Sequence, residues 1–509
     1  MQWLNKVVDE AIAVHPDGEI LVSSGVSPSG VYHVGTLREV LTADAIMLAL
    51  RTRGRDSRHI HVVDDLDPLR KIPSGVSADF EKYFGMSLCE VPAPDGKALS
   101  WAEYYFKDFA KSAKQLGLDM EIIRSHKKYR SGFFIPAIEK VLDSIDKARE
   151  VITKISGRQL DENWSPIQIR EDSYLKSRRF IGIDTKAKVI FYEDKNGAQK
   201  EVSYARGEVK LYWRLDWPAR WWLLGVDVEP FGRDHATKGG SYDTGVGLMK
   251  KIFGEPAPYS VPYNFIIRTG QTKKMSKSTG DTIAISDMLE VLPPEVLRYF
   301  VLRYAPDKQL FFDETDGIVK LIDDFAALLA KEDKTNDDEQ LIEISMAGVS
   351  QSTISNIPFS HLVASYQAAL KNIDNTLEII RRTEHRATVD NQENTIRQEL
   401  KFIDNWLKKW APEDVKFELA TILPKELSDK EITYLKTLAQ KIESAPPDAD
   451  GEWFHKAIYE LRESTGLLPK QLFATLYRAL IGKESGPRAG WFLSILPRDW
   501  LVKRLKLEA

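Results

Sequence analysis

The chain of 509 residues contains a single cysteine, Cys89. One thiol cannot form an intrachain disulfide or a cysteine-based metal cluster. This excludes the disulfide-stabilised class of small secreted proteins and is typical of a reducing compartment. A lone cysteine is more often a small buried side chain than a nucleophile, so we assign Cys89 no chemistry.

Long hydrophobic runs are also absent. No stretch reaches 18 consecutive apolar residues, so the sequence predicts no membrane-spanning helix and no membrane partner. The segment from Met1 to Lys6 lacks the charged and apolar regions of a secretion signal. We therefore expect a cytoplasmic protein.

The chain has no excess of positive charge. Its formal net charge is −4, with 43% hydrophobic and 29% charged residues, which is ordinary for a soluble globular protein. If nucleic acid is a partner, local basic surfaces must hold it. The length is sufficient for about three domains of roughly 150 residues each.

A glycine-rich turn from Ser24 to Thr36 is the segment around which the chain is organised. The apolar run Ile20–Val22 enters this turn and an amphipathic run from Leu37 leaves it, which predicts strand, turn and helix. Such a junction directs backbone N–H groups and the positive end of a helix dipole at one spot, which suits a phosphate. His33 would stand at the start of the helix, although an ordinary surface histidine is the alternative.

A second motif reads Lys274-Met275-Ser276-Lys277-Ser278. Alone, two lysines and two hydroxyls could be a solvated loop. However, His-x-Gly-Thr near the N-terminus and this motif roughly 240 residues later rarely co-occur by chance.

The strand-forming stretch Arg58–Val63 runs into an acidic segment from Asp64 to Pro73. Strand, helix and strand at this spacing indicate a parallel sheet, in which ligands gather beyond the carboxyl ends of the strands. We therefore expect the acidic segment at the ligand edge.

Further on, short strands are predicted at 180–183, 188–192 and 201–204, with a hairpin turn at Asp194–Gly197.

The stretch from Lys210 to Trp222 combines five aromatic residues with three cations and Asp216. A buried carboxylate needs a partner, which a cationic substrate between aromatic faces would supply. The alternative is an ion pair of Asp216 with an arginine inside an aromatic core. Gly232-Arg233-Asp234-His235 follows, and Val261–Ile267 is predicted as the last core strand.

The two phosphate motifs resemble the ATP-binding motifs of class I aminoacyl-tRNA synthetases. Their order with the acidic segment, the Trp213–Trp217 segment and the Gly232–His235 motif resembles the class I lysyl-tRNA synthetases of archaeal type, over nearly the whole chain. The resemblance implies ATP-dependent activation of L-lysine and its transfer to the 3′ end of tRNA(Lys), with Mg²⁺ accompanying ATP.

The resemblance also assigns residues. It implies catalytic roles for His33, Lys274 and Lys277. It implies ATP binding by Pro28, Ser29, Gly30, His33, Gly35, Thr36, Lys274, Met275, Ser276, Lys277 and Ser278. For the lysine substrate it implies Gly25, Ser27, Trp213, Asp216, Trp217, His235 and Tyr263.

Three departures from the family pattern stand out. Thr36 replaces the more familiar histidine, and Arg233 stands where lysine is expected. Many relatives carry a cysteine-based zinc ribbon in the β-rich insertion, but the region from Pro166 to Gly207 has no cysteine. We therefore predict no metal site and no zinc there, with apolar packing stabilising the strands instead.

The resulting fold class is α/β, with a Rossmann-type parallel-sheet catalytic domain, an α+β insertion and an all-α C-terminal anticodon-binding region. The predicted parts are the first Rossmann half at 1–85, a connective insertion with a zinc-less β unit at 86–210, the second Rossmann half at 211–270, the lysine-motif loop with stem-contact helices at 271–330, and the helical domain at 331–509. Within the helical domain we expect a polar linker from Lys331 to about Pro358, followed by a helix from Leu362 to Arg382. The oligomeric state stays open, with a monomer favoured.

Other functions fit parts of the pattern. A class I synthetase for glutamate, cysteine or arginine would share the ATP motifs, although Asp216 among aromatic residues favours a cation over glutamate. A nucleotidyltransferase that does not use tRNA would share the phosphate motifs, but the long helical C-terminal region argues against it. An inactive RNA-binding paralogue is disfavoured because both ATP motifs are intact.

Overall fold

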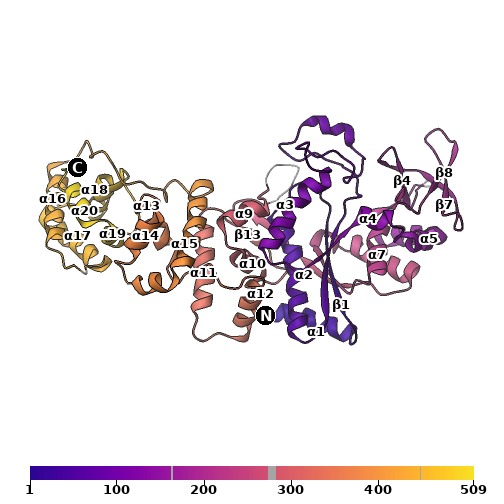
Figure 1. Cartoon of the computed structure of the whole chain (residues 1–509), viewed down its shortest axis with the longest axis horizontal. Coiled ribbons are helices and arrows are strands. Elements are labelled where there is room, and N and C mark those ends of the chain that lie inside the picture. Colours follow the sequence, from indigo (N-terminus) through magenta and orange to yellow (C-terminus); the bar gives the residue numbers. More distant parts are fainter. Residues whose placement is uncertain (162–163, 273–281, 448, 509) are drawn as a thin grey trace. The chain divides into compact units, whose positions relative to one another are not determined.

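A computed structural model describes residues 1–161, 164–272, 282–447 and 449–508 (Figure 1). The motif from Lys274 to Ser278 lies outside the described residues. The chain divides into two compact units, and the domain boundaries expected from the sequence stay predictions. Unit 1 comprises Met1–Leu289, Leu297–Phe312 and Asp333–Val349, and unit 2 comprises Glu290–Val296, Asp313–Glu332 and Ser350–Ala509.

A parallel sheet of five strands forms the centre of unit 1, in the order β11-β10-β1-β2-β3. This confirms the Rossmann-type fold predicted from the sequence. The strands are β1 (Ile20–Val26), β2 (Ser57–Val63), β3 (Glu121–Arg124), β10 (Val228–Gly232) and β11 (Tyr259–Tyr263).

The connection from β1 to β2 is the predicted glycine-rich turn followed by α2 (Val34–Thr52). Most side chains of α2 are buried, because the helix packs on the sheet, on α1 (Gln2–Val14) and on other parts of unit 1. The hydrophobic signal is therefore spread around the helix instead of forming one stripe. The turn lies at the carboxyl end of β1, where a parallel sheet binds its ligands.

The predicted β-rich insertion is present. Antiparallel strands β6, β7 and β8 form one sheet, with Asp194–Gly197 turning between β7 and β8 as expected. A further sheet, β5-β4-β9, was not predicted. These strands are β4 (Ile167–Glu171), β5 (Tyr174–Ser177), β6 (Arg179–Asp184), β7 (Val189–Glu193), β8 (Gln199–Ser203) and β9 (Val209–Leu211).

The aromatic stretch after β9 is not a strand of the main sheet. It forms α7 (Trp213–Leu224), which ends at Gly225 with a left-handed backbone. The predicted last core strand is also divided, because β11 ends at Tyr263 and β12 (Ile266–Arg268) pairs with β13 (Leu310–Phe312) in a separate sheet. The remaining helices of unit 1 are η1 (Ala78–Tyr83), α3 (Trp101–Gln115), α4 (Ser125–Arg130), α5 (Ile135–Asp143), α6 (Ile145–Ser156), η2 (Arg233–His235), α8 (Ser241–Leu248), the π-helix η3 (Met249–Phe253) and α12 (Asn336–Ser345).

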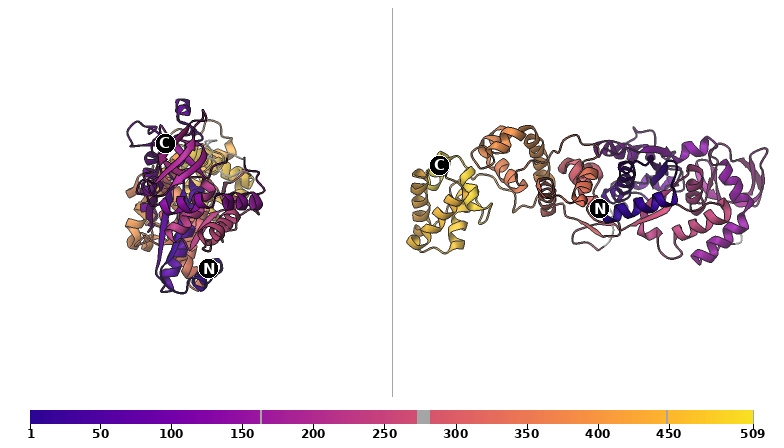
Figure 2. Two further views of the ribbon diagram at one scale, coloured as in Figure 1. Left: turned by 90° about the vertical axis from the view of Figure 1, so that its right-hand side faces the viewer. Right: turned by 90° about the horizontal axis from the view of Figure 1, so that it is seen from below.

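Unit 2 is helical in its described residues, drawn mainly in orange and yellow in Figure 2. Its buried core includes leucine, isoleucine and aromatic side chains of several helices, as the sequence predicted. The residues of α9 (Ile285–Val291) and α10 (Pro294–Leu302) are divided between the two units. The helices of unit 2 that follow are α11 (Asp316–Ala330), α13 (Phe359–Ala368), α14 (Ile373–Ile380), α15 (Arg386–Lys409), α16 (Asp429–Glu443), α17 (Gly451–Thr465), α18 (Pro469–Ile481), α19 (Ala489–Ile495) and α20 (Arg498–Leu505).

Two expectations about the helical part were wrong. The segment at 331–358 is not only a polar linker, because it contains α12, which a capping box at Thr335 and Asp338 starts. The helix expected from Leu362 to Arg382 is divided into α13 and α14, because Leu370 and Lys371 adopt left-handed backbone angles. In the described part of the chain, no helix is long and apolar enough to cross a membrane.

Candidate active site

Two adjoining cavities lie at the carboxyl edge of the parallel sheet in unit 1. The first has a volume of about 670 Å³ and the second about 440 Å³. Their common walls follow the ends of β1, β2, β10 and β11, so the ligand edge predicted from the strand order is where the cavities occur. The residues that line both are Gly25, Val26, Ser27, Glu39, Asp67, His235, Tyr263 and Phe265.

His33 lines the first cavity and caps α2. Its Nδ1 accepts a hydrogen bond of 3.0 Å from the Gly35 N–H. Because Nδ1 acts as the acceptor, the neutral ring carries its proton on Nε2. His33 can therefore present an N–H donor beside a helix N-terminus, which is a suitable arrangement for a phosphate.

Gly35 leaves no room for a side chain. A Cβ atom at this position would lie 2.7 Å from Cε1 and 2.8 Å from Nδ1 of His33. We predict that Gly35→Ala displaces the His33 ring and lowers the rate of adenylate formation about 10- to 100-fold, measured by pyrophosphate exchange. Gly182→Ala is the matched control, because nothing lies within 4 Å of its added carbon. Equal rates for the two variants would contradict the proposed role of the His33 cap.

The sequence-predicted ATP residues separate into three groups. Ser29, His33, Gly35 and Thr36 line the first cavity. Pro28 and Gly30 are buried in the turn and do not line it, so their contribution is to turn geometry. Lys274, Met275, Ser276, Lys277 and Ser278 lie outside the described residues.

The predicted acidic segment contributes both signs of charge. Asp67, Arg70 and Lys71 line the first cavity. The two cations are phosphate-binding candidates that the sequence reasoning did not single out. Asp65 takes a structural role instead, since it is fully buried and binds Arg124 and His126.

The second cavity has aromatic walls and an acidic interior. Trp213, Trp217 and Trp221 line it together with Phe231. Its charged lining comprises the carboxylates of Glu39, Asp64, Asp67, Glu229 and Asp234, and one guanidinium, that of Arg220. Apolar walls with an excess of carboxylates suit a ligand with an aliphatic stem and a cationic end.

Glu229 is the most distinctive of these carboxylates. It is 7% exposed, and the indole N–H groups of Trp217 and Trp221 both donate to it. Burial raises its pKa, but the two indole donors and the nearby Arg220 favour the ionised form. The two indole donors thus hold the buried Glu229 carboxylate in the aromatic part of the cavity.

Asp216 does not line either cavity, which corrects the prediction of a direct substrate contact. Its carboxylate is 1% exposed and accepts from Tyr129, and Arg220 lies 3.0 Å from it. Lys210 lies 3.7 Å away and also approaches Asp64 and Asp67. Asp216 is therefore part of an internal charge cluster. This is the alternative given in the sequence analysis, in which Asp216 pairs with an arginine inside the core.

This cluster makes a separate prediction. Asp216→Asn should lower the free energy of unfolding by about 3 kcal/mol, because Lys210 and Arg220 lose a buried counter-charge. Urea unfolding followed by tryptophan fluorescence would measure the loss. In the protein that remains folded, the KM for the amino acid should stay within about threefold of wild type. If Asp216→Asn left the stability unchanged and strongly raised the KM for the amino acid, Asp216 would be a substrate-binding residue instead of a structural one.

Glu39 joins the two cavities. The Gly25 N–H and the Tyr263 hydroxyl each donate to it over 2.7 Å. Burial raises the pKa of Glu39 to about 7, although both donors favour its ionised form. Beside it, the Ser27 hydroxyl donates to Asp67 over 2.8 Å. Gly25, Ser27 and Tyr263 thus lie together, as predicted.

His235 completes the common wall. Its ring lies edge-on to Trp213 and Trp217, with centroid distances of 6.3 and 5.4 Å. Nδ1 of His235 lies 3.3 Å from the Ser241 hydroxyl, at the start of α8. Of the residues predicted to bind the amino-acid substrate, all except Asp216 therefore line the second cavity.

Sequence reasoning missed Glu39 and Glu229. In Val228–Phe231 the available signal was a single acid within an otherwise apolar segment, whereas in Leu37–Leu41 Glu39 stands beside Arg38 and the signal is weaker. A buried carboxylate beside a ligand edge needs a partner, so such an acid is a candidate site residue.

The comparisons with known proteins cover the whole chain. Residues 1–353 match the family described as "tRNA synthetases class I (K)", and residues 395–508 match an "Anticodon binding domain". Lysine–tRNA ligase 1 of Methanosarcina acetivorans is 34% identical, covering 99% of this chain and 98% of that protein. The lysine–tRNA ligase of Archaeoglobus fulgidus is 35% identical, covering 95% and 96%. The lysine–tRNA ligase of Pyrococcus horikoshii is 34% identical and covers both chains completely.

These matches agree with the parallel sheet, the glycine-rich turn that begins α2, and the helical unit 2. From the fold, the cavities and the full-length similarity together, the chain belongs to the class I tRNA synthetases, in the family designated K.

Proposed function

We propose that this chain is a lysine–tRNA ligase, which activates L-lysine with ATP to lysyl-adenylate and transfers the lysyl group to the 3′ end of tRNA(Lys). The supporting observation is the common wall of the two cavities. One cavity has a phosphate-binding helix start, and the other has aromatic walls and Glu229. A carboxylate of the amino acid and an α-phosphate of ATP would meet at Gly25, Ser27 and Tyr263.

The first step requires positioning and charge stabilisation. The lysine carboxylate attacks the α-phosphorus of ATP, a P–O bond forms, and pyrophosphate leaves with the electrons of the broken bond. The Nε2–H of His33 and the N-terminus of α2 would stabilise negative charge on the phosphates. Lys274 and Lys277 would add cations from the other side, with Mg²⁺ bound to the ATP substrate.

Glu229 would hold the ε-ammonium group of lysine. Its two indole donors prevent the carboxylate from rotating, and the tryptophan rings would pack on the aliphatic stem. A glutamate substrate would place two carboxylates together in a desolvated pocket, so the site rejects it. Cysteine would leave Glu229 without a partner. Arginine is the remaining cationic competitor.

The pKa of Glu39 predicts that the use of lysine depends on pH. Below pH 7 Glu39 is mostly protonated, and above pH 7 it is mostly ionised and can bind the α-ammonium group of lysine. We therefore predict that kcat/KM for lysine rises as the pH increases through about 7, and that Glu39→Gln removes this step. Pyrophosphate exchange between pH 5.5 and 8.5 would measure it. A profile with the same step in Glu39→Gln would contradict this role.

Unit 2 would bind the anticodon of the tRNA. Of its cations, Lys503 and Arg488 are candidates for phosphate contacts. Arg504 is not, because it is 1% exposed and donates to backbone carbonyls of Ala479 and Ile422. Arg381 is a poor candidate for a phosphate contact, because it already forms ion pairs with Glu378, Asp390 and Glu393.

A pyrophosphate-exchange panel with all the amino acids tests the function. Lysine should give the highest rate, arginine should give a lower rate than lysine, and glutamate and cysteine should give rates near background. A higher rate with another amino acid would assign a different synthetase. Exchange with no amino acid present would support a nucleotidyltransferase instead.

A further inference from the structure

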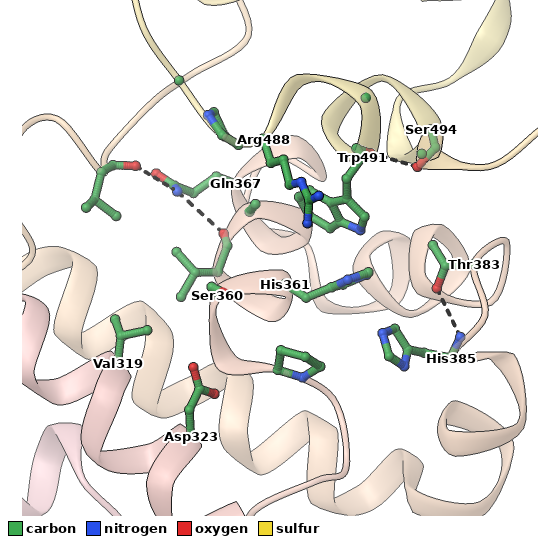
Figure 3. A pocket seen from close by; sticks show the side chains of 18 of the residues that line it. Val319, Asp323, Ser360, His361, Gln367, Thr383, His385, Arg488, Trp491 and Ser494 are labelled. Carbon is green, nitrogen blue, oxygen red and sulfur yellow. Dashed lines mark hydrogen bonds between the residues drawn. The ribbon is translucent and has the colours of Figure 1, made fainter. Parts of the chain in front are cut away.

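Unit 2 contains a cavity that the proposed reaction does not use. It has a volume of about 1590 Å³ and lies among α11, α13, α19 and the segment between α14 and α15 (Figure 3). Its charged lining has more acids than bases. The carboxylates are Asp316, Asp323, Asp324, Glu384, Asp414, Asp450 and Glu452, and the cations are Lys320, Arg382 and Arg488.

Two histidines meet in this cavity. His361 belongs to α13 and His385 is the N-cap of α15, and their rings lie edge-on with centroids 4.7 Å apart. The other side of His361 lies against Trp491 of α19, at 4.2 Å, so its ring is held between Trp491 and His385, as Figure 3 shows.

His361 has a polar atom without a partner. The side chain is 8% exposed, and its Nε2 is buried with no hydrogen bond. A neutral imidazole with an unused nitrogen lone pair is the form that binds a metal ion.

A third ligand comes from Glu384. One ligand atom each from His361, Glu384 and His385 all lie within 4.8 Å of one another. Nε2 of His385 and a carboxylate oxygen of Glu384 are 3.6 Å apart. In a tetrahedral zinc site with bonds of about 2.1 Å, neighbouring ligand atoms lie about 3.4 Å apart. Since the Glu384 side chain is 70% exposed, it can adjust its position toward the two histidines without disturbing the core.

We propose that His361, Glu384 and His385 form a binding site for one divalent transition-metal cation of the zinc type. Two imidazoles and one carboxylate favour zinc, nickel or copper over magnesium or calcium, which prefer oxygen ligands. Three protein ligands leave one position for water.

The charge of the cavity favours a cation over RNA at this point. Nucleic-acid sites need an excess of positive charge near the phosphates, and the lining here is acidic. The bound ion would join α13 to the start of α15, because its ligands come from both. It would therefore stabilise the helical packing of unit 2.

The test uses the untagged full chain after treatment with EDTA and removal of the chelator. Isothermal titration with ZnCl₂ should show one site per chain. Zinc should also raise the melting temperature, because an ion that binds only the folded state stabilises it. Glu384→Gln and His385→Ala should each weaken zinc binding at least about tenfold.

The controls separate binding from folding. His455 lines the same cavity but is outside the three-residue group, so His455→Ala should bind zinc as wild type does. Glu384→Gln should melt at the wild-type temperature without zinc, because the side chain is exposed. No saturable zinc binding, or equal affinity in wild type and in the Glu384→Gln and His385→Ala variants, would overturn the proposal. RNA binding that depends on His361 in the absence of zinc binding would assign the cavity to the tRNA instead.

Discussion

Glu229→Gln should lower kcat/KM for lysine in pyrophosphate exchange by about 10²- to 10³-fold. The substitution keeps the size of the side chain and one acceptor for the indole donors, but it removes the charge that pairs with the ε-ammonium group. Leaving that ammonium without a counter-charge in a dry pocket costs about 3–4 kcal/mol, which corresponds to this loss. The KM for ATP should stay within about threefold, since Glu229 lines only the second cavity.

Glu399→Gln is a matched control for this experiment. Glu399 is also almost fully buried, at 1% exposed, and accepts hydrogen bonds from Ser355, but it belongs to α15 in unit 2. Its variant should activate lysine at the wild-type rate. If Glu229→Gln and Glu399→Gln behave alike, Glu229 does not bind the amino acid and the assignment of the second cavity is wrong.

Lys277→Ala should lower the rate of adenylate formation about 10²-fold or more, and His33→Asn should cause a similar loss. Asparagine keeps an oxygen that can cap α2 but removes the Nε2 donor, so the helix start is preserved. If both groups act on the phosphates of one ATP, the double variant should lose less than the product of the two single losses. We expect a coupling energy of about 1 kcal/mol or more.

Lys195→Ala is the control variant for this double-mutant cycle. Lys195 is an exposed lysine in the hairpin turn between β7 and β8. Combined with His33→Asn, it should show no coupling. Full additivity of Lys277→Ala and His33→Asn would show that the two motifs act independently, which would contradict their convergence on one nucleotide.

Much of the fold could be predicted from local signals. The apolar run Ile20–Val22, the glycine turn and the helix after it specify a strand–turn–helix junction, because backbone geometry and hydrophobic period agree there. The pairing of β4 with β9 was missed because the paired residues, such as Ile169 and Val209, are 40 or more residues apart in the sequence. Local periodicity carries no information on such pairing.

A local signal was overlooked for the helix expected between Leu362 and Arg382. The hydrophobic period continues through Leu370 and Lys371, although both adopt left-handed backbone angles. Neither glycine nor proline marks the break, but the Asn372 side chain caps the start of α14. In the same way, the capping box at Thr335 is a local signal that could have revealed α12.

The site was predictable in its motifs and not in its charge pairing. The cavities are lined by residues of the turn from Ser24 to Thr36 and by His235 and Tyr263, which the motifs had singled out. Asp216 and Glu229 are both acids near tryptophans, and sequence alone does not show which one faces the cavity. The structure distinguishes them, because Lys210, Arg220 and Tyr129 surround Asp216, whereas Glu229 lines the cavity.

The crystal structure of the chain with a non-hydrolysable lysyl-adenylate analogue tests the central claim most directly. The account predicts that the analogue occupies both cavities, with its ε-ammonium nitrogen within about 3 Å of a Glu229 oxygen and its phosphate mimic beside His33 and the start of α2. An analogue whose ammonium group lies at Asp216, or whose phosphate mimic lies away from His33, would contradict it.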